Sequence, residues 1–225
     1  MPSAGHRPKT LISWSSGKDS AWMAHVLRAS GDLELVGIVT TINEEFDRVA
    51  MHGVRHEILR AQADALDLPL WPVPLPWPCS NLEYESRMNQ VISEAVQKGV
   101  EQIAYGDLFL EDIRRYRIEK LAGTGIEPIF PLWGLPTPKL ARDMIAGGLE
   151  AVVTCIDPRQ LDPRLVGRKF DERFLMDLPS SADPCGENGE FHTLCFGGPM
   201  FCKRINICAG EVCQRDGFWF ADMLL

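Results

Sequence analysis

The chain has 225 residues, a formal net charge of −8, and 45% hydrophobic and 24% charged residues, as expected for an ordinary soluble globular protein with a sizeable core. The acidic balance argues against nucleic acid as the main partner, because a polyanion needs a basic surface. No apolar run approaches the roughly 18 to 20 residues that span a bilayer, so we expect no membrane insertion.

The cysteines favour a reduced, cytoplasmic protein. Seven cysteines are scattered without a C-x-x-C pair, and no charged-then-apolar signal segment stands at the N-terminus. We expect most of them to be core residues, because thiols prefer burial. Cys185 is of separate interest, since it adjoins a stretch rich in glutamate.

The first informative stretch lies near the N-terminus. Thr10–Ser13 is a short apolar run that predicts a buried strand, Ser15–Ser20 is a tight turn of small residues, and Ala21–Leu27 has helical apolar spacing. Small side chains let a ligand approach the backbone, and the free N–H groups at a helix start attract anions such as phosphate. The pattern predicts a phosphate-binding loop, although a serine-rich helix cap would have the same composition.

This loop is not a Walker A loop, G-x-x-x-x-G-K-[ST]. Ile12 stands five residues before Gly17, where that motif needs glycine, and Asp19 follows Lys18, where it needs Ser or Thr. Asp19 could approach a metal ion, or could complement the positive end of the helix dipole.

The following segments alternate between strand and helix, which predicts a parallel sheet covered on both faces. Strands are expected over Leu33–Thr41, Leu70–Leu75, Gln102–Tyr105, Ile126–Trp133 and Leu149–Cys155, and helices over Val54–Leu66, Leu82–Lys98, Glu111–Ala122, Lys139–Ala146 and Leu165–Leu178.

Two further features accompany this alternation. Gly106 and Asp107 follow a strand, so they should face the same crevice as Ser15–Ser20, unless they form only a solvated turn. Arg114–Arg117 is a basic cluster on a helix, which could bind pyrophosphate or substrate, or could simply coat a solvated face.

The C-terminal part contains the second informative stretch. Pro179–Pro184 is a candidate hinge between a nucleotide-binding domain, residues 1–155, and a substrate-binding part, residues 156–225. After it, Asp183–Thr193 packs two glutamates and His192 between glycines. These groups could hold a metal, orient an amine or exchange protons, or could be solvated groups of a turn. Antiparallel strands are expected over Leu194–Phe196, Lys203–Ala209 and Phe218–Met223.

A zinc site is the weaker interpretation of two histidines. His52 and His56 stand four residues apart on an expected helix, but the Glu of H-E-x-x-H and a third ligand are missing. We therefore favour surface or capping roles for both.

The two stretches together resemble a known family. Ser15–Ser20 resembles the S-G-G-x-D-S loop of the ATP pyrophosphatases, with Ser16 in place of the first glycine. Gly186–Thr193 resembles the G-E-x-G-E-[YF]-x-T element of the diphthine–ammonia ligases within that group, and Gly106-Asp107 and Pro131–Trp133 match further family landmarks. The resemblance covers Lys9 to Asp222.

The resemblance implies a fold and a reaction. The fold is α/β, with a parallel twisted sheet flanked by helices, as in the adenine nucleotide alpha hydrolases, and a smaller C-terminal α+β part. In the reaction, a carboxylate attacks the α-phosphate of ATP to give an acyl adenylate and pyrophosphate, and ammonia then displaces AMP. ATP and Mg²⁺ would be the cofactors, and free ammonia the nitrogen donor, because no glutaminase segment is visible.

The resemblance also implies roles for particular residues. Lys18, Asp19, Glu187 and Glu190 would be catalytic, with Asp19 at the metal and both glutamates facing the acceptor. The nucleotide-binding residues would be Ser15, Ser16, Gly17, Lys18, Asp19, Ser20, Thr40, Gly106 and Asp107.

One departure bears on the acceptor. Phe191-His192 stands where archaeal and eukaryotic members have Tyr and an acidic residue, which resembles the shorter bacterial members. Bacteria do not make diphthamide, so a bacterial member would act on another carboxylate, in a small molecule or a protein side chain. Assembly of two copies of this chain into a homodimer is a further alternative that the sequence leaves open. The alternatives are a tRNA-modifying sulfur or amino transferase of the same fold and a non-catalytic ATP-binding regulatory protein.

Overall fold

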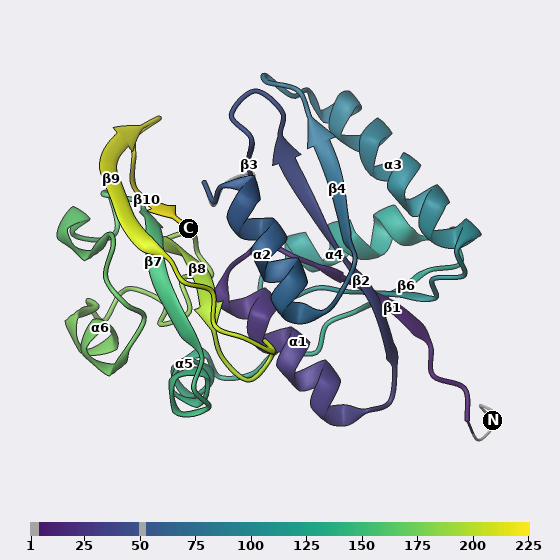
Figure 1. Ribbon diagram of the computed structural model, residues 1–225, viewed down its shortest axis with the longest axis horizontal. Coiled ribbons are helices and arrows are strands. Elements are labelled where there is room, and N and C mark those ends of the chain that lie inside the picture. The colour runs from purple at the N-terminus through teal and green to yellow at the C-terminus, as the bar shows by residue number, and fades with distance from the viewer. Residues whose placement is uncertain (1–4, 50–52) are drawn as a thin grey trace.

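The structure is a computed structural model that describes residues 5–49 and 53–225. The described part folds around two β-sheets that lie side by side, one from the N-terminal half and one from the C-terminal part (Figure 1). The first sheet is mostly parallel and flanked by helices, and the second is antiparallel. The predicted fold class, α/β with a smaller C-terminal α+β part, is confirmed.

In the first sheet the parallel strands follow the order β4, β2, β1, β5, β6, and the short β3 pairs antiparallel with the end of β2. The chain adds strands on one side of β1 and then on the other, so the strand order reverses between β1 and β5. The bounds are Lys9–Ser13 (β1), Glu34–Asn43 (β2), Arg48–Val49 (β3), Leu70–Leu75 (β4), Gln102–Ala104 (β5) and Glu127–Ile129 (β6).

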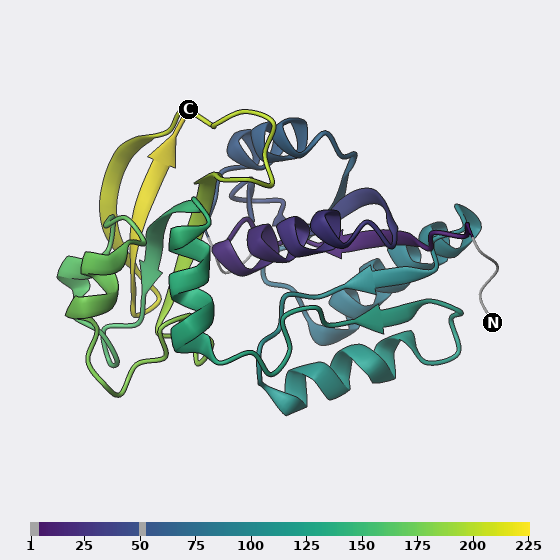
Figure 2. The ribbon, with the colours of Figure 1, turned by 90° about the horizontal axis from the view of Figure 1, so that it is seen from below.

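Helices cover both faces of this sheet because neighbouring strand residues point to opposite sides. Leu11 packs among residues of α3 and α4, whereas Ile12 packs among residues of α1 and α2. Figure 2 shows these two helix pairs on opposite sides of the sheet. Within the described ranges, no helix has the length and apolarity needed to cross a membrane. The bounds are Lys18–Ser30 (α1), His56–Leu66 (α2), Asn81–Gln97 (α3) and Glu111–Leu121 (α4).

The second sheet has the order β8, β7, β10, β9, with antiparallel neighbours. Leu140 and Met144 of α5 are buried in the same apolar cluster as the inner residues of β7. The bounds are Thr137–Ala146 (α5), Glu150–Ile156 (β7), Glu172–Asp177 (α6), Phe191–Gly197 (β8), Cys208–Arg215 (β9) and Phe218–Leu224 (β10).

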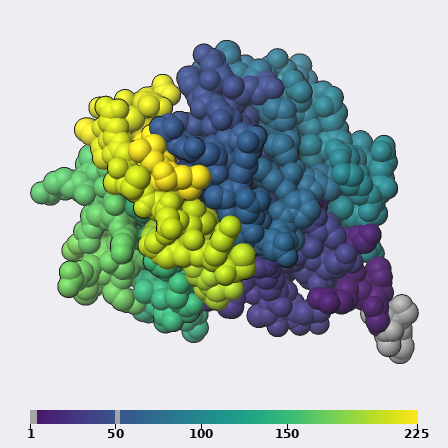
Figure 3. All heavy atoms as spheres, in the orientation of Figure 1, coloured from purple at the N-terminus to yellow at the C-terminus, as the bar shows by residue number. Residues whose placement is uncertain are grey.

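Backbone hydrogen bonds and ion pairs join the N-terminal half to the C-terminal part. The Cys202 N–H donates to the Ala65 carbonyl oxygen at the end of α2, at 2.7 Å. Asp222 on β10 forms ion pairs with Arg48, at 2.8 Å, and with Arg55, at 2.6 Å. Figure 3 shows the C-terminal segments, in yellow, packed directly against the blue N-terminal part.

The prediction of one helix over Leu165–Leu178 is wrong. A 3₁₀ turn, η1 (Pro163–Leu165), and the short α6 flank a stretch that runs along β7 instead. Gly167 has a φ of +78°, which ends the turn, and its N–H donates to the Val153 carbonyl oxygen at 2.8 Å. The apolar spacing in this stretch therefore reflects contacts beside β7 rather than a helix face.

Two predicted strands also differ from the structure. The strand expected over Lys203–Ala209 is β9, which begins only at Cys208. The prediction was misplaced because this mostly exposed edge strand lacks an alternating apolar pattern. The strand expected over Ile126–Trp133 ends at Ile129, since residues 131–134 form a turn. The expected boundary after residue 155 falls inside β7, which pairs with β8 and β10 in the second sheet.

Candidate active site

The candidate site is a cleft of about 250 Å³ at the carboxyl ends of β1 and β5. The strand order reverses between these strands, and open α/β sheets bind ligands at such a point. Part of the loop Ser15–Ser20 after β1 lines the cleft together with residues 105–107 after β5. Residues between 185 and 193 of the C-terminal part form a third wall. The cleft therefore lies where the two parts of the molecule meet.

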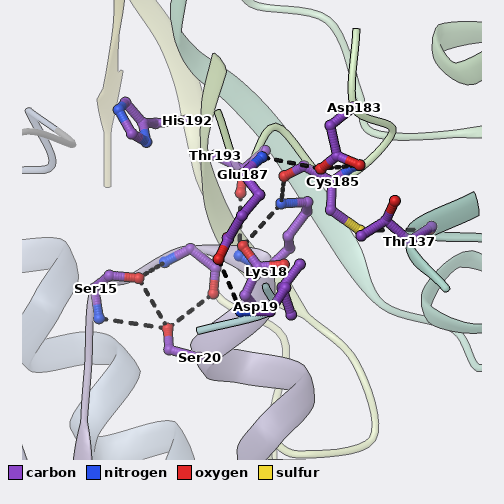
Figure 4. A network of polar contacts seen from close by, with 12 residues as sticks. Ser15, Lys18, Asp19, Ser20, Thr137, Asp183, Cys185, Glu187, His192 and Thr193 are labelled. Carbon is purple, nitrogen blue, oxygen red and sulfur yellow. Dashed lines mark hydrogen bonds and ion pairs between the residues drawn. The ribbon is translucent and has the colours of Figure 1, made fainter. Parts of the chain in front are cut away.

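Hydrogen bonds between its own residues hold the loop in shape (Figure 4). The Ser15 and Ser20 hydroxyl oxygens lie 3.2 Å apart, and the Ser20 hydroxyl donates to the Gly17 carbonyl oxygen at 3.0 Å. The Gly17 N–H donates to the Ser15 hydroxyl at 3.3 Å. Helix α1 begins at Lys18, within this loop, so its positive dipole end is adjacent to the cleft.

Ser16 adopts the backbone conformation that the missing glycine would favour. Its φ is +70°, in the left-handed region, and its fully buried side chain has a hydroxyl without a hydrogen-bond partner. Its carbonyl oxygen accepts from the Cys195 N–H of β8 at 2.9 Å. Tertiary contacts therefore impose a conformation that costs a non-glycine residue about 1 kcal/mol or more.

Gln62 of α2 holds the loop from behind, and sequence reasoning missed it. Its fully buried side-chain amide donates to the carbonyl oxygens of Ser16, at 3.0 Å, and Cys195, at 2.6 Å. Its oxygen accepts from the Trp14 indole N–H at 3.0 Å. The available signal was a polar side chain on the apolar face of a predicted helix, one turn after Ile58.

Lys18 joins the loop to the C-terminal wall rather than extending into open space. Its buried ammonium donates to the Asp19 carboxylate at 2.8 Å and to the Cys185 carbonyl oxygen, and lies 5.3 Å from the Phe191 ring centre. Burial alone would lower the pKa of Lys18, but the negative groups around it, Asp19 first, hold that pKa above its usual range. The side chain is therefore charged at neutral pH.

Asp19 and Asp107 bring two carboxylates to the cleft. Burial raises the pKa of both, against the opposing effect of Lys18 on Asp19 and of Arg117 on Asp107. Each has one buried carboxylate oxygen without a hydrogen-bond partner. Such oxygens fit Mg²⁺, which takes one or two carboxylates and completes its shell with phosphate and water. No group of three or more His, Cys, Asp or Glu among residues 5–49 and 53–225 could hold a metal by itself.

Glu187 faces these aspartates from the C-terminal wall. One carboxylate oxygen accepts from the Leu108 N–H at 2.7 Å, and burial raises the pKa of the side chain to about 7. Gly106 allows this close arrangement, because a Cβ there would lie 3.3 Å from backbone atoms of Asp19 and Ser20. The carboxyl of Glu187 can therefore exchange a proton near neutral pH.

The predicted site residues fall into two groups. Thr40 and Glu190 lie outside the cleft lining: the Thr40 hydroxyl donates to the Trp14 carbonyl oxygen at 2.9 Å, and a Glu190 carboxylate oxygen accepts from the Asp183 N–H at 2.8 Å. Glu190 therefore orders the C-terminal loop from inside. The cleft is lined by Ser15, Lys18, Asp19, Ser20, Gly106, Asp107 and Glu187, whereas Ser16, Gly17, Thr40 and Glu190 are not among its lining residues.

His192 and Cys185 line the cleft in their uncharged forms. Burial lowers the pKa of His192 to about 4, and raises the pKa of Cys185 above its usual range. The Cys185 thiol donates to the Thr137 carbonyl oxygen at 3.6 Å, and Figure 4 shows the His192 ring apart from Lys18 and Glu187. A thiolate nucleophile is not supported at this position.

The histidine pair gives no support for a metal site. His52 lies outside the described residues, and the Nδ1 atom of His56 is paired with an Asp47 carboxylate oxygen at 2.8 Å.

Comparison with known proteins places the chain in a family. Residues 8–126 match the profile of the diphthamide synthase N-terminal domain, and residues 136–223 match that of the diphthamide synthase C-terminal domain. Curated proteins named diphthine–ammonia ligase from Bos taurus and Homo sapiens are each 26% identical, over 92% of this chain and 85% of the relative. The relative of that name from Schizosaccharomyces pombe is 26% identical, over 92% of this chain and 37% of its own length. The chain belongs to the diphthamide synthase family, which includes the ATP-dependent diphthine–ammonia ligases.

Proposed function

We propose that this protein is an ATP-dependent ligase that activates a carboxylate as an acyl adenylate and then amidates it with ammonia. One observation carries the proposal. The Ser15–Ser20 loop, at the reversal of strand order, faces Asp107 and Glu187 across a single cleft. The names of the curated relatives support ammonia as the second substrate.

In the first step, a carboxylate oxygen attacks the α-phosphorus of ATP, and the bond from that phosphorus to the departing pyrophosphate breaks. Negative charge builds on the pyrophosphate, so the positive dipole end of α1 and the Lys18 charge would stabilise the transition state. Mg²⁺, held by Asp19 and Asp107, would neutralise part of the phosphate charge when it is bound.

In the second step, ammonia attacks the acyl carbon, AMP leaves, and the nitrogen must lose a proton. Glu187 is suited to accept that proton, because its pKa of about 7 keeps a large fraction ionised at neutral pH. The Leu108 N–H, at 2.7 Å, fixes one of its carboxylate oxygens and leaves the other for the reacting groups. Glu190 would keep this loop in place without touching substrate.

The test is the identity of the nucleotide products. Purified protein with ATP, Mg²⁺, ammonium and a panel of carboxylic acids should release AMP and pyrophosphate in equal amounts. Glu187→Gln should slow amide formation strongly, whereas Glu34→Gln, an exposed position at the opposite end of the sheet, should not change it. Formation of ADP and phosphate would reject the proposal.

A further inference from the structure

Helix α4 carries two arginines that lie over aromatic rings beside the cleft. Arg114 and Arg117 are three residues apart, so they share one face of the helix. The Arg114 guanidinium carbon lies 4.6 Å from the centre of the Trp133 ring, and that of Arg117 lies 4.8 Å from the centre of the Tyr105 ring. Stacking of this kind fixes the plane of each guanidinium.

The Nε atom of each guanidinium has no hydrogen-bond acceptor within the described part of the chain. Both Nε atoms are buried, and that of Arg117 forms a long ion pair with an Asp107 carboxylate oxygen at 3.6 Å, which is beyond hydrogen-bond distance. Buried donors without acceptors are costly and in native proteins call for an explanation. An anionic ligand would supply the missing acceptors.

The location connects this pair with the reaction. Arg117 lines the cleft together with Lys18, but the Lys18 ammonium is already bound to Asp19 and the Cys185 carbonyl oxygen. Arg114 is not among the residues that line the cleft. It lies over Trp133, one turn before Arg117, and the ring contacts from Trp133 to Phe130 and from Phe130 to Tyr105 connect it with the cleft wall.

We propose that Arg114 and Arg117 bind a second anionic group of the acceptor, so that the substrate is an acid with a carboxylate to be activated and another carboxylate or a phosphate held by the arginines. The inference rests on the proposed function, since it names the class of its acceptor. The planar, paired donors of arginine suit both kinds of anion.

The first experiment compares acids of equal length. Succinate, glutarate and adipate should support pyrophosphate release with kcat/KM at least about tenfold above butyrate, valerate and hexanoate, because charge-assisted hydrogen bonds are strong. Adding 3-phosphonopropionate distinguishes a phosphate-like second group from a carboxylate. Equal kcat/KM values for the monoanionic and dianionic acids would overturn the inference.

The second experiment uses variants of the helix. Arg114→Gln should raise the KM for the best dianionic acid at least about tenfold and leave the KM for ATP within about twofold. Arg114→Lys, which keeps the charge but loses the paired donors, should raise the acceptor KM less. Arg115→Gln, on the exposed face of the same helix, should change neither KM. A rise in the KM for ATP instead would assign the arginines to the nucleotide and overturn the inference.

A binding measurement tests the anion site independently of the proposed ligase activity. Calorimetric titration of the full chain, with Mg²⁺ and a non-hydrolysable ATP analogue, should detect glutarate binding that Arg114→Gln abolishes. Such binding without pyrophosphate release from any acid would support the anion site and reject the ligase. Pyrophosphate release that is insensitive to Arg114→Gln would support the ligase and reject the anion site. Absence of both would reject both.

Discussion

The ammonium of Lys18 donates to the carbonyl oxygen of Cys185, 167 residues away in sequence, and to the carboxylate of its neighbour Asp19. This contact fastens the loop after β1 to the C-terminal wall of the cleft. One buried charge therefore helps to hold the two parts of the molecule in the arrangement that forms the site.

Removing the charge of Lys18 should destabilise the folded protein. Lys18→Met leaves the Asp19 carboxylate and the Cys185 carbonyl oxygen without their donor, so the free energy of unfolding should fall by about 3 kcal/mol. Lys139→Met is the matched control, because the Lys139 side chain is 70% exposed and pairs with Asp143 on the same helix. Urea denaturation of both variants measures the difference. A loss below about 1 kcal/mol for Lys18→Met would contradict the anchoring role.

Ser16 offers a test in the opposite direction. Ser16→Gly should raise the free energy of unfolding by about 1 kcal/mol, because glycine adopts a φ of +70° without strain and removes the unpaired hydroxyl. Ser16→Ala removes the same hydroxyl but keeps the strain, so it should remain less stable than Ser16→Gly. Equal stability of the two variants in urea would mean that the left-handed conformation is not maintained in solution.

Gln62 should prove essential for the shape of the loop. Gln62→Glu replaces the donor that faces the Ser16 and Cys195 carbonyl oxygens with an acceptor, and should cost at least about 2 kcal/mol of stability. It should also raise the KM for ATP, because the loop would lose its support. Gln97→Leu, on the exposed surface of α3, should change stability by less than about 0.5 kcal/mol. An unchanged KM for ATP in Gln62→Glu would show that the Gln62 amide does not support the nucleotide-binding loop.

The pKa of Glu187 predicts a pH dependence of stability. Because burial raises the pKa from 4.5 to about 7, the folded protein binds this proton more tightly than the unfolded chain does. The resulting contribution to stability is fully present below pH 4.5 and is lost as the pH rises through 7. Wild type should therefore lose stability relative to Glu187→Gln over this range. If the free energy of unfolding followed the same pH dependence in wild type and Glu187→Gln, the raised pKa of Glu187 would be contradicted.

The same group should govern the second half of the reaction. With hydroxylamine in place of the more basic ammonia, protonation of the nucleophile affects the profile less, and the rate of acyl transfer should rise with pH around a midpoint near 7. Glu187→Gln should be slow and should lose that midpoint. A midpoint that persists in Glu187→Gln would assign the titration to another group.

Much of the fold was predictable because its sequence signals are local. Apolar runs of the right length predicted β4 at its observed bounds and β2 and β10 to within two residues at each end. The predicted helix over Leu165–Leu178 failed because its apolar residues pack beside β7, a long-range contact that periodicity cannot distinguish from a helix face.

Residues of the candidate site were predictable only where a local sequence signal, a motif or the end of a strand, marks them. The loop after β1 and Gly106-Asp107 were found from strand ends, since carboxyl ends of parallel strands meet at one edge. Gln62 was missed because its partners, Trp14, Ser16 and Cys195, come together only in the folded chain. The inward position of Glu190 likewise depends on the turn that surrounds it.

The most direct test of the central claim follows an oxygen atom. The best carboxylic acid acceptor is labelled with ¹⁸O in its carboxylate and incubated with ATP, Mg²⁺ and ammonium, and the AMP is analysed by mass spectrometry. Attack of the carboxylate on the α-phosphorus predicts one labelled oxygen in each AMP and none in pyrophosphate. Unlabelled AMP, or ADP and phosphate as the products, would contradict the account.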